Sequence, residues 1–110
     1  MTDNTVLCIG LDAACFEQLT PLVEQGEMPN LERLLDRGVS GPLATTTPPW
    51  TPSAWPSITT GTTPWTHGIY DFYDHTGEQP QLVSARDLQV PYLWDYLDEA
   101  GQRRSWSMFR

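Results

Sequence analysis

Residues 5–11 read Thr-Val-Leu-Cys-Ile-Gly-Leu, and the next residue, Asp12, carries a carboxylate. This short apolar run contains β-branched residues and no charge, a composition typical of a strand buried in a parallel sheet. Asp12 would then lie at the carboxyl end of that strand, where open α/β sheets bind their ligands. The run therefore predicts an α/β fold and makes Asp12 the first candidate site residue.

Two helices are predicted after this run. Apolar residues at helical spacing follow Asp12, and Pro21 interrupts this first helix or starts a new turn before Gly26 ends it. Residues 29–37, PNLERLLDR, predict an amphipathic helix that Asn30 caps and a left-handed Gly38 ends. Residues 39–45 predict a second strand, with Leu43 facing inward.

Residues 45–64 are rich in proline and threonine, a composition that also occurs in flexible linkers. Two tryptophans in this stretch argue against a linker, because linkers carry few large aromatic side chains. The spacing predicts a helix with Thr51 as its N-cap, Pro52 as its first residue and Gly61 as its stop. Pro56 is expected to disrupt this helix after one turn.

The remainder of the chain predicts fewer elements. Residues 69–73, IYDFY, predict either a strand or a loop that faces a ligand, and residues 76–80, TGEQP, predict a turn. Residues 91–100, PYLWDYLDEA, predict a helix with Gly101 after it. Residues 102–110 have no apolar period and predict neither a helix nor a strand.

The charge of the chain limits its partners. Its formal net charge is −8, and all six basic residues are arginines. No nucleic-acid surface is expected, because binding to phosphate backbones needs a cationic footprint. An acidic chain without lysine is consistent with adaptation to high salt, or with a GC-rich genome that favours arginine.

Composition also bears on compartment. No apolar run is long enough for a membrane span, so no membrane partner is expected. The sequence Met1-Thr2-Asp3-Asn4 does not resemble a signal peptide, which favours a cytoplasmic location. Cys8 and Cys15 are then expected to be free, buried thiols.

Thr51 could act in phosphoryl transfer. A hydroxyl at a helix N-terminus lies beside unpaired N–H groups that stabilise a phosphate oxyanion. Such a hydroxyl can attack phosphorus when a cation lowers its pKa. The alternative is that the Thr-Pro pair only caps the helix.

Other polar residues leave comparable alternatives open. Asp12 could ligate zinc or a hard cation, or it could cap the following helix. Asp71, Asp74 and His75 could bind a metal or form a solvated loop. His67, which precedes Gly68, could orient the backbone in a turn or act directly in catalysis.

Two longer stretches carry a family resemblance. Residues 28–38 read MPNLERLLDRG, and residues 60–72 read TGTTPWTHGIYDF. In order with Asp12 and Thr51, they resemble the N-terminal part of the type I phosphodiesterase/nucleotide pyrophosphatase family of the alkaline phosphatase superfamily. The resemblance extends from residue 5 to about residue 101, and the ordered set is more specific than any single motif.

The resemblance implies an incomplete three-layer α/β sandwich like that of alkaline phosphatase, with a parallel-rich sheet between helices. It also implies two divalent metal ions, usually zinc, and a small phosphate-ester or nucleotide substrate. Asp12 matches the first metal ligand, and Thr51 matches the nucleophile, which also approaches a metal. The residues that match the family signature without an assigned chemical role are Thr60, Gly61, Pro64, His67 and Gly68.

The chain departs from the family in its ligand set. One Asp and one Thr cannot hold two zinc ions, because each ion needs about four donors. We therefore expect residues 1–110 to be the truncated N-terminal portion of one phosphodiesterase-like domain, inactive alone. The alternatives are a non-catalytic α/β module, or a phosphatase or phosphomutase of the same superfamily. A sulfatase is disfavoured, because Thr51-Pro52-Ser53 does not match the Cys/Ser-x-Pro-x-Arg motif of that branch.

Overall fold

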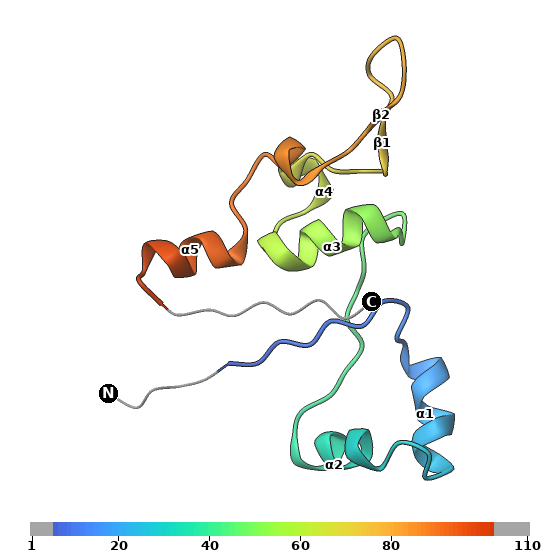
Figure 1. Ribbon diagram of the computed structural model, residues 1–110. Helices are drawn as coiled ribbons and strands as arrows, with labels where there is room; N and C mark the ends of the chain where they lie inside the picture. Colours follow the sequence, from blue (N-terminus) through green and yellow to red (C-terminus); the bar gives the residue numbers. More distant parts are fainter. Residues whose placement is uncertain (1–5, 103–110) are drawn as a thin grey trace. The chain divides into compact units, whose positions relative to one another are not determined.

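A computed structural model describes residues 6–102 of the chain. The chain divides into two compact units, Met1–Ala44 and Thr45–Arg110, and each is described by itself. The elements in chain order are α1 (Phe16–Glu24), α2 (Pro29–Arg37), α3 (Thr51–Thr60), α4 (Pro64–His67), β1 (Tyr73–Asp74), β2 (Gln81–Leu82), the 3-10 turn η1 (Ala85–Asp87) and α5 (Leu93–Glu99) (Figure 1).

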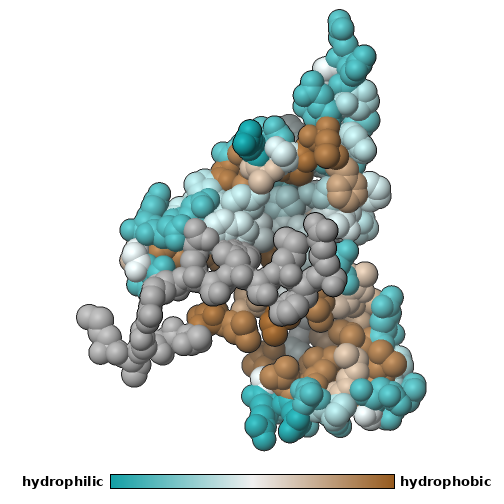
Figure 2. Space-filling model, in the orientation of Figure 1, coloured by the Kyte–Doolittle hydropathy of each residue, from teal (hydrophilic) through white to brown (hydrophobic). Residues whose placement is uncertain are grey.

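The first unit is built on the packing of α1 against α2. A partly open apolar pocket of about 220 Å³ lies between the two helices. Its lining comes from both helices: Phe16, Leu19, Thr20, Val23, Glu24, Leu31 and Leu35. Apolar side chains also gather on the surface of this unit that Figure 2 displays, so the two helices alone do not bury all of their apolar surface.

The helix α2 has the predicted bounds, Pro29–Arg37, but neither predicted cap is correct. Met28 is the N-cap residue, and the side chain of Asn30 instead accepts a hydrogen bond from Arg33 Nη2. Gly38 has φ −108° and ψ −164°, an extended conformation rather than a left-handed one. A Cβ at Gly38 would lie 2.9 Å from the Leu34 carbonyl oxygen, so close backbone approach explains the glycine.

The two strands predicted in the first unit are absent. Residues 6–11 and 39–45 form no regular secondary structure. The expected burial is wrong as well, since Val6 is 88% exposed and Leu43 is 86% exposed. A strand needs a neighbour that pairs with its N–H and C=O groups, and neither segment has one among residues 6–102.

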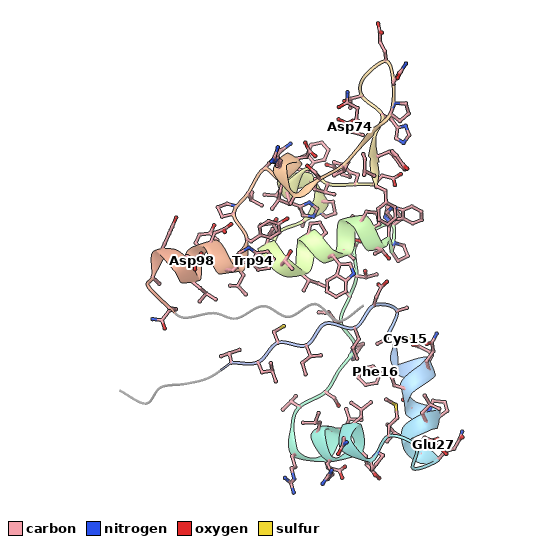
Figure 3. All side chains as sticks on the ribbon, viewed as in Figure 1. Cys15, Phe16, Glu27, Asp74, Trp94 and Asp98 are labelled. Atoms are coloured by element: carbon pink, nitrogen blue, oxygen red, sulfur yellow. The ribbon has the colours of Figure 1, made fainter. Side chains whose placement is uncertain are left out.

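The start of α1 excludes the capping role considered for Asp12. The helix begins at Phe16 with Cys15 as N-cap, as Figure 3 shows for these two residues, and Asp12 lies in an exposed turn before it. Pro21 lies inside α1 without ending it, and the helix is followed by Gly26 at φ +76°.

Both cysteines are free, as predicted, but the expected burial of both thiols is wrong. Cys8 is exposed and Cys15 is partly buried.

In the second unit, α3 runs from Thr51 to Thr60 and differs from its prediction in two ways. Trp50 is the N-cap residue, so Thr51 is the first helical residue rather than the cap. Pro56 lies within the helix and does not disrupt it. In the last turns, the hydroxyls of Thr59 and Thr60 donate to the carbonyls of Trp55 and Pro56. Gly61 ends the helix at φ +68°, the predicted left-handed stop.

The rest of the second unit contains a short hairpin and a helix. Strands β1 and β2 are antiparallel, with Tyr73 opposite Leu82, and the predicted turn at residues 76–80 joins them. Asp74 lies on this hairpin (Figure 3). The helix predicted over 91–100 is observed as α5, and the Tyr92 N–H donates to Asp95 Oδ2 at 2.8 Å.

The observed architecture confirms a mixed α/β composition but shows no parallel sheet. The described residues contain helices and one two-stranded antiparallel sheet. The predicted irregular tail lies outside the described residues, apart from Gln102. No helix in residues 6–102 is long and apolar enough to cross a membrane.

We predict that Gly61→Ala destabilises the second unit by about 1–2 kcal/mol, the cost of a left-handed conformation for a residue with a Cβ. Nothing lies within 4 Å of the added Cβ, so the cost is conformational alone. Chemical denaturation followed by tryptophan fluorescence measures it, because all tryptophans in residues 6–102 lie in this unit.

Gly77→Ala is the matched control for Gly61→Ala. Gly77 lies in the same unit, has no left-handed φ and would make only an ordinary contact. Its substitution should change the unfolding free energy by less than about 0.5 kcal/mol. Equal destabilisation by the two variants would contradict the conformational explanation.

Candidate functional site

Thr51 is exposed and is the first residue of α3. The Trp50 carbonyl already accepts hydrogen bonds from the N–H groups of Ser53 (3.2 Å) and Ala54 (2.9 Å). Pro52 has no N–H to donate. Within residues 6–102, the Thr51 N–H is therefore the first-turn donor that remains for an anion beside the Thr51 hydroxyl.

Two hydroxyl groups, of Thr46 and Ser53, make hydrogen-bonding contacts with the segment that leads into α3. Thr46 Oγ1 donates to the Pro48 carbonyl at 2.9 Å and lies 3.1 Å from Ser53 Oγ. Ser53 Oγ donates to the Trp50 carbonyl at 3.1 Å. Ser53 is only 3% exposed, so the two contacts of its hydroxyl are partly shielded from water, whereas the bond between Thr46 and Pro48 is exposed. They fix the backbone on both sides of Thr51.

A pocket of about 210 Å³ begins at the residue after Thr51. Pro52 and Pro56 line one wall, since residues four apart share a helix face. The other lining residues are Ile69, Asp71, Phe72, Val83, Ser84, Ala85, Leu88 and Tyr92. Burial raises the pKa of Tyr92, as does the nearby Asp95 carboxylate, so Tyr92 presents a neutral phenol to this mostly apolar pocket.

His67 is the most deeply buried side chain described, with no exposed surface. Its Nε2 lies 2.9 Å from Ser57 Oγ of α3, and its Nδ1 accepts a hydrogen bond of 3.1 Å from the Ile69 N–H. Its carbonyl accepts from the Gln89 N–H at 3.1 Å. His67 thus orients backbone in a turn, as one of the two predicted roles stated, and it also joins three segments.

Gly68 allows the backbone to turn directly after His67, between α4 and the segment at Ile69. It has φ +82°, and an added Cβ would lie 2.6 Å from Gln89 Nε2. The left-handed backbone favours glycine here, and an added Cβ would also displace the Gln89 side chain.

The described residues do not form a metal cluster. No group of three or more His, Cys, Asp or Glu side chains in residues 6–102 is placed to hold an ion. Asp12 belongs to the first unit and Thr51 to the second, so the structure does not bring these two candidates together within one unit.

The polar cluster after α4 has local partners that favour the loop alternative. Asp71 Oδ1 accepts from the Phe72 N–H at 2.6 Å. Asp74 Oδ1 accepts from the Thr76 N–H at 2.8 Å, and this bond lowers the pKa of Asp74. His75 is exposed, and its ring lies 6.4 Å from that of Tyr73.

Sequence reasoning missed three residues that organise the site: Ser53, Ser57 and Gln89. The spacing of the two serines is a usable signal, because residues four apart lie on one face of a helix and here both approach buried polar groups. Nothing local in the sequence identifies Gln89, since its contact with Gly68 joins segments far apart in the chain.

Comparison with known proteins gives one match. The family model described as type I phosphodiesterase / nucleotide pyrophosphatase matches residues 6–109. No curated protein and no solved structure matches the chain. The match includes both units and every candidate site residue considered above.

We predict that Gly68→Ala destabilises the second unit more than Gly61→Ala does. Both variants carry the left-handed strain, but only Gly68→Ala also displaces the Gln89 side chain. Unfolding free energies of both variants, measured by denaturant titration, give the difference.

A double-mutant cycle isolates the contribution of the clash. In a Gln89→Ala background the cost of Gly68→Ala should fall to that of Gly61→Ala, because only the backbone strain remains. An unchanged cost in that background would show that Gln89 does not limit this position.

Proposed function

The chain belongs to the type I phosphodiesterase/nucleotide pyrophosphatase family, and we propose that it supplies Thr51 as the nucleophile of a hydrolase of phosphodiester or nucleotide pyrophosphate bonds. The observation that carries this proposal is the position of Thr51. Its hydroxyl is exposed on the first residue of α3, and its own N–H remains available for an anion. The positive end of the helix dipole favours a bound phosphate there.

The proposed reaction has two steps at phosphorus. In the first, Thr51 Oγ1 loses its proton and attacks phosphorus, and the bond to the leaving alkoxide or phosphate oxygen breaks. The leaving group takes up a proton, and a phosphoester on Thr51 remains. In the second, water attacks the same phosphorus and the Thr51 oxygen leaves, which regenerates the hydroxyl and releases the phosphate monoester.

The pocket beside α3 supports a small organic phosphate ester as substrate. Its volume of about 210 Å³ and its apolar wall suit one uncharged or aromatic group of the ester. Pro52 connects this wall directly to Thr51. Asp71, which is partly buried at the pocket, supplies an acceptor for a donor group on the ligand.

Family members are generally metal-dependent, yet the described donors do not fit two metal ions. A zinc ion takes about four donors, and the candidates here are one carboxylate and one hydroxyl. We propose that Asp12 ligates one of two divalent ions, with zinc as the expected metal and Thr51 near it. The other ligands must then come from outside residues 6–102.

The exposed apolar segments support the view that the chain is the N-terminal portion of a larger domain. Val6, Leu7, Ile9 and Leu11 are 67–88% exposed, and Val39 and Leu43 are exposed as well. Burial of such side chains is strongly favourable when a neighbouring sheet is available. We propose that residues 5–11 and 39–45 become strands of a parallel-rich sheet in an alkaline-phosphatase-like three-layer sandwich.

The shortage of ligands also supports a second candidate function for this chain alone, a non-catalytic α/β module. A phosphatase or phosphomutase of the same superfamily is the other alternative, since it would share Asp12 and the hydroxyl nucleophile.

Equilibrium dialysis of the 110-residue chain against zinc should find no tight stoichiometric binding, because no described cluster offers three ligands. Two tightly bound ions would contradict this assessment of the donors.

For the nucleophile, we predict that Thr51→Ala in the full natural polypeptide lowers metal-dependent hydrolysis of an aryl phosphodiester by on the order of 10³-fold or more. The loss should be in kcat, because the hydroxyl forms a bond only during the reaction. Steady-state kinetics on a chromogenic diester measure it.

Two variants control for this measurement. Thr51→Ser keeps a hydroxyl in place and should retain most of the activity. Thr66→Ala removes an exposed threonine hydroxyl from the short helix α4, and activity should remain near that of the parent. Full activity of Thr51→Ala would refute the role of Thr51.

A further inference from the structure

Two hydrogen bonds determine which nitrogen of His67 carries the proton. The Ile69 N–H donates to Nδ1 at 3.1 Å, so Nδ1 must present a lone pair. The single proton of the neutral ring then lies on Nε2, which is 2.9 Å from Ser57 Oγ. The imidazole therefore donates to α3 and accepts from the turn after α4.

Protonation would break this arrangement. A second proton on Nδ1 would face the Ile69 N–H, and two donors cannot share a hydrogen bond. No compensating charge lies on the helices concerned: α3 has no ionisable side chain, and α4 has none besides His67.

The charged residues nearest in sequence to the segments that His67 contacts are either hydrogen-bonded locally or exposed. Asp71 accepts from the Phe72 N–H, and Asp87 accepts from the Ser84 N–H at 2.7 Å. Arg86 lies on η1 and is exposed.

We propose that His67 is a positioning residue, which holds α3, and with it the nucleophile Thr51, through a neutral ring protonated at Nε2. The connection to Thr51 is short. The ring contacts Ser57 of α3, and Ser53, one turn earlier in the same helix, bonds the Trp50 carbonyl next to Thr51. The expected effect on activity rests on the proposed function. The tautomer of His67 and the contact of its ring with α3 do not.

The proposal has a defined pH dependence. Burial lowers the pKa of His67 from the ordinary value of 6.5, and the bond to the Ser53 carbonyl opposes this only in part. The unfolded chain therefore binds a proton at a higher pH than the folded chain does. Stability is fully present above about pH 6.5 and falls as the pH decreases toward the folded pKa.

Two isosteric variants separate the two bonds of the ring. His67→Asn places an amide oxygen near Nδ1 and keeps the acceptor for the Ile69 N–H, but it loses the donor to α3. His67→Gln places an amide nitrogen near Nε2 and keeps the donor to Ser57, but it loses the acceptor. His75→Gln is the matched control, because His75 is exposed and lies on the hairpin turn.

The first test is NMR of the 15N-labelled 110-residue chain at about pH 8, well above the ordinary imidazole pKa. Long-range 1H–15N spectra should show His67 as the Nε2–H tautomer. His67→Gln should leave the α3 amide shifts close to the parent and move Ile69, and His67→Asn should do the reverse. A Nδ1–H tautomer, or α3 shifts that move equally in both variants, would overturn the proposal.

The decrease in the free energy of unfolding at acid pH is a second readout on the same chain. Denaturant titrations between about pH 8 and pH 5 should show stability falling in the parent and in His75→Gln. Both His67 variants should lose the part of this fall that depends on His67, because neither amide titrates in this range. An unchanged decrease at acid pH in both His67 variants would overturn the assignment of the pH dependence to His67.

The activity arm uses the full natural polypeptide and a chromogenic diester. His67→Asn should lower kcat by on the order of tenfold to a hundredfold with little change in KM, since misplacement of the nucleophile acts on the chemical step. His67→Gln should restore most of kcat. If Thr51→Ala abolishes activity but both His67 variants are fully active, positioning by His67 is refuted and the nucleophile stands. If Thr51→Ala is active, the proposed function fails. The NMR result then still tests whether the neutral His67 ring holds α3.

Discussion

The second unit depends on one buried imidazole. His67 has no exposed surface, and it links α3, the turn at Ile69 and the bend at Gln89 through its ring and its carbonyl. A buried polar group is tolerated only when its hydrogen bonds are satisfied, and no buried side-chain nitrogen or oxygen atom among the described residues lacks a partner. The junction therefore gives α3 one defined position, which a small apolar core would specify less sharply.

That position matters because α3 presents Thr51. Prolines at positions 48, 49 and 52 restrict the backbone before and after the threonine. The Ser53 hydroxyl contacts the Thr46 hydroxyl and the Trp50 carbonyl, and so connects the segment before α3 to its first turn. A hydroxyl on a helix end is common in proteins and by itself indicates no chemistry. Here the next residue, Pro52, lines a pocket, the buried His67 ring contacts the same helix, and the chain belongs to a phosphodiesterase family. These three facts together support our proposal that Thr51 is the nucleophile.

Local sequence signals predicted the parts of the fold that local interactions determine. The helix at residues 29–37 and the left-handed stop at Gly61 are correct, because helical periodicity and glycine conformation are properties of short segments. The strands predicted at residues 5–11 and 39–45 are absent, because a strand needs a partner that residues 6–102 do not supply. Side-chain competition explains the wrong cap at Asn30, whose oxygen pairs with Arg33.

The site divides in the same way. Thr51 at the start of a helix and His67 in a backbone turn followed from the neighbouring residues. The contact between Gly68 and Gln89 could not be predicted, because twenty intervening residues determine where that segment returns.

The most direct measurement of the central claim is a single-turnover experiment on the full natural polypeptide with a phosphorus-labelled diester. After an acid quench, peptide mapping by mass spectrometry should place the label on the oxygen of Thr51. A P-chiral phosphorothioate analogue of the diester should be hydrolysed with overall retention of configuration at phosphorus, as two successive displacements require. Label on another residue, or inversion of configuration without a covalent intermediate, would contradict the account.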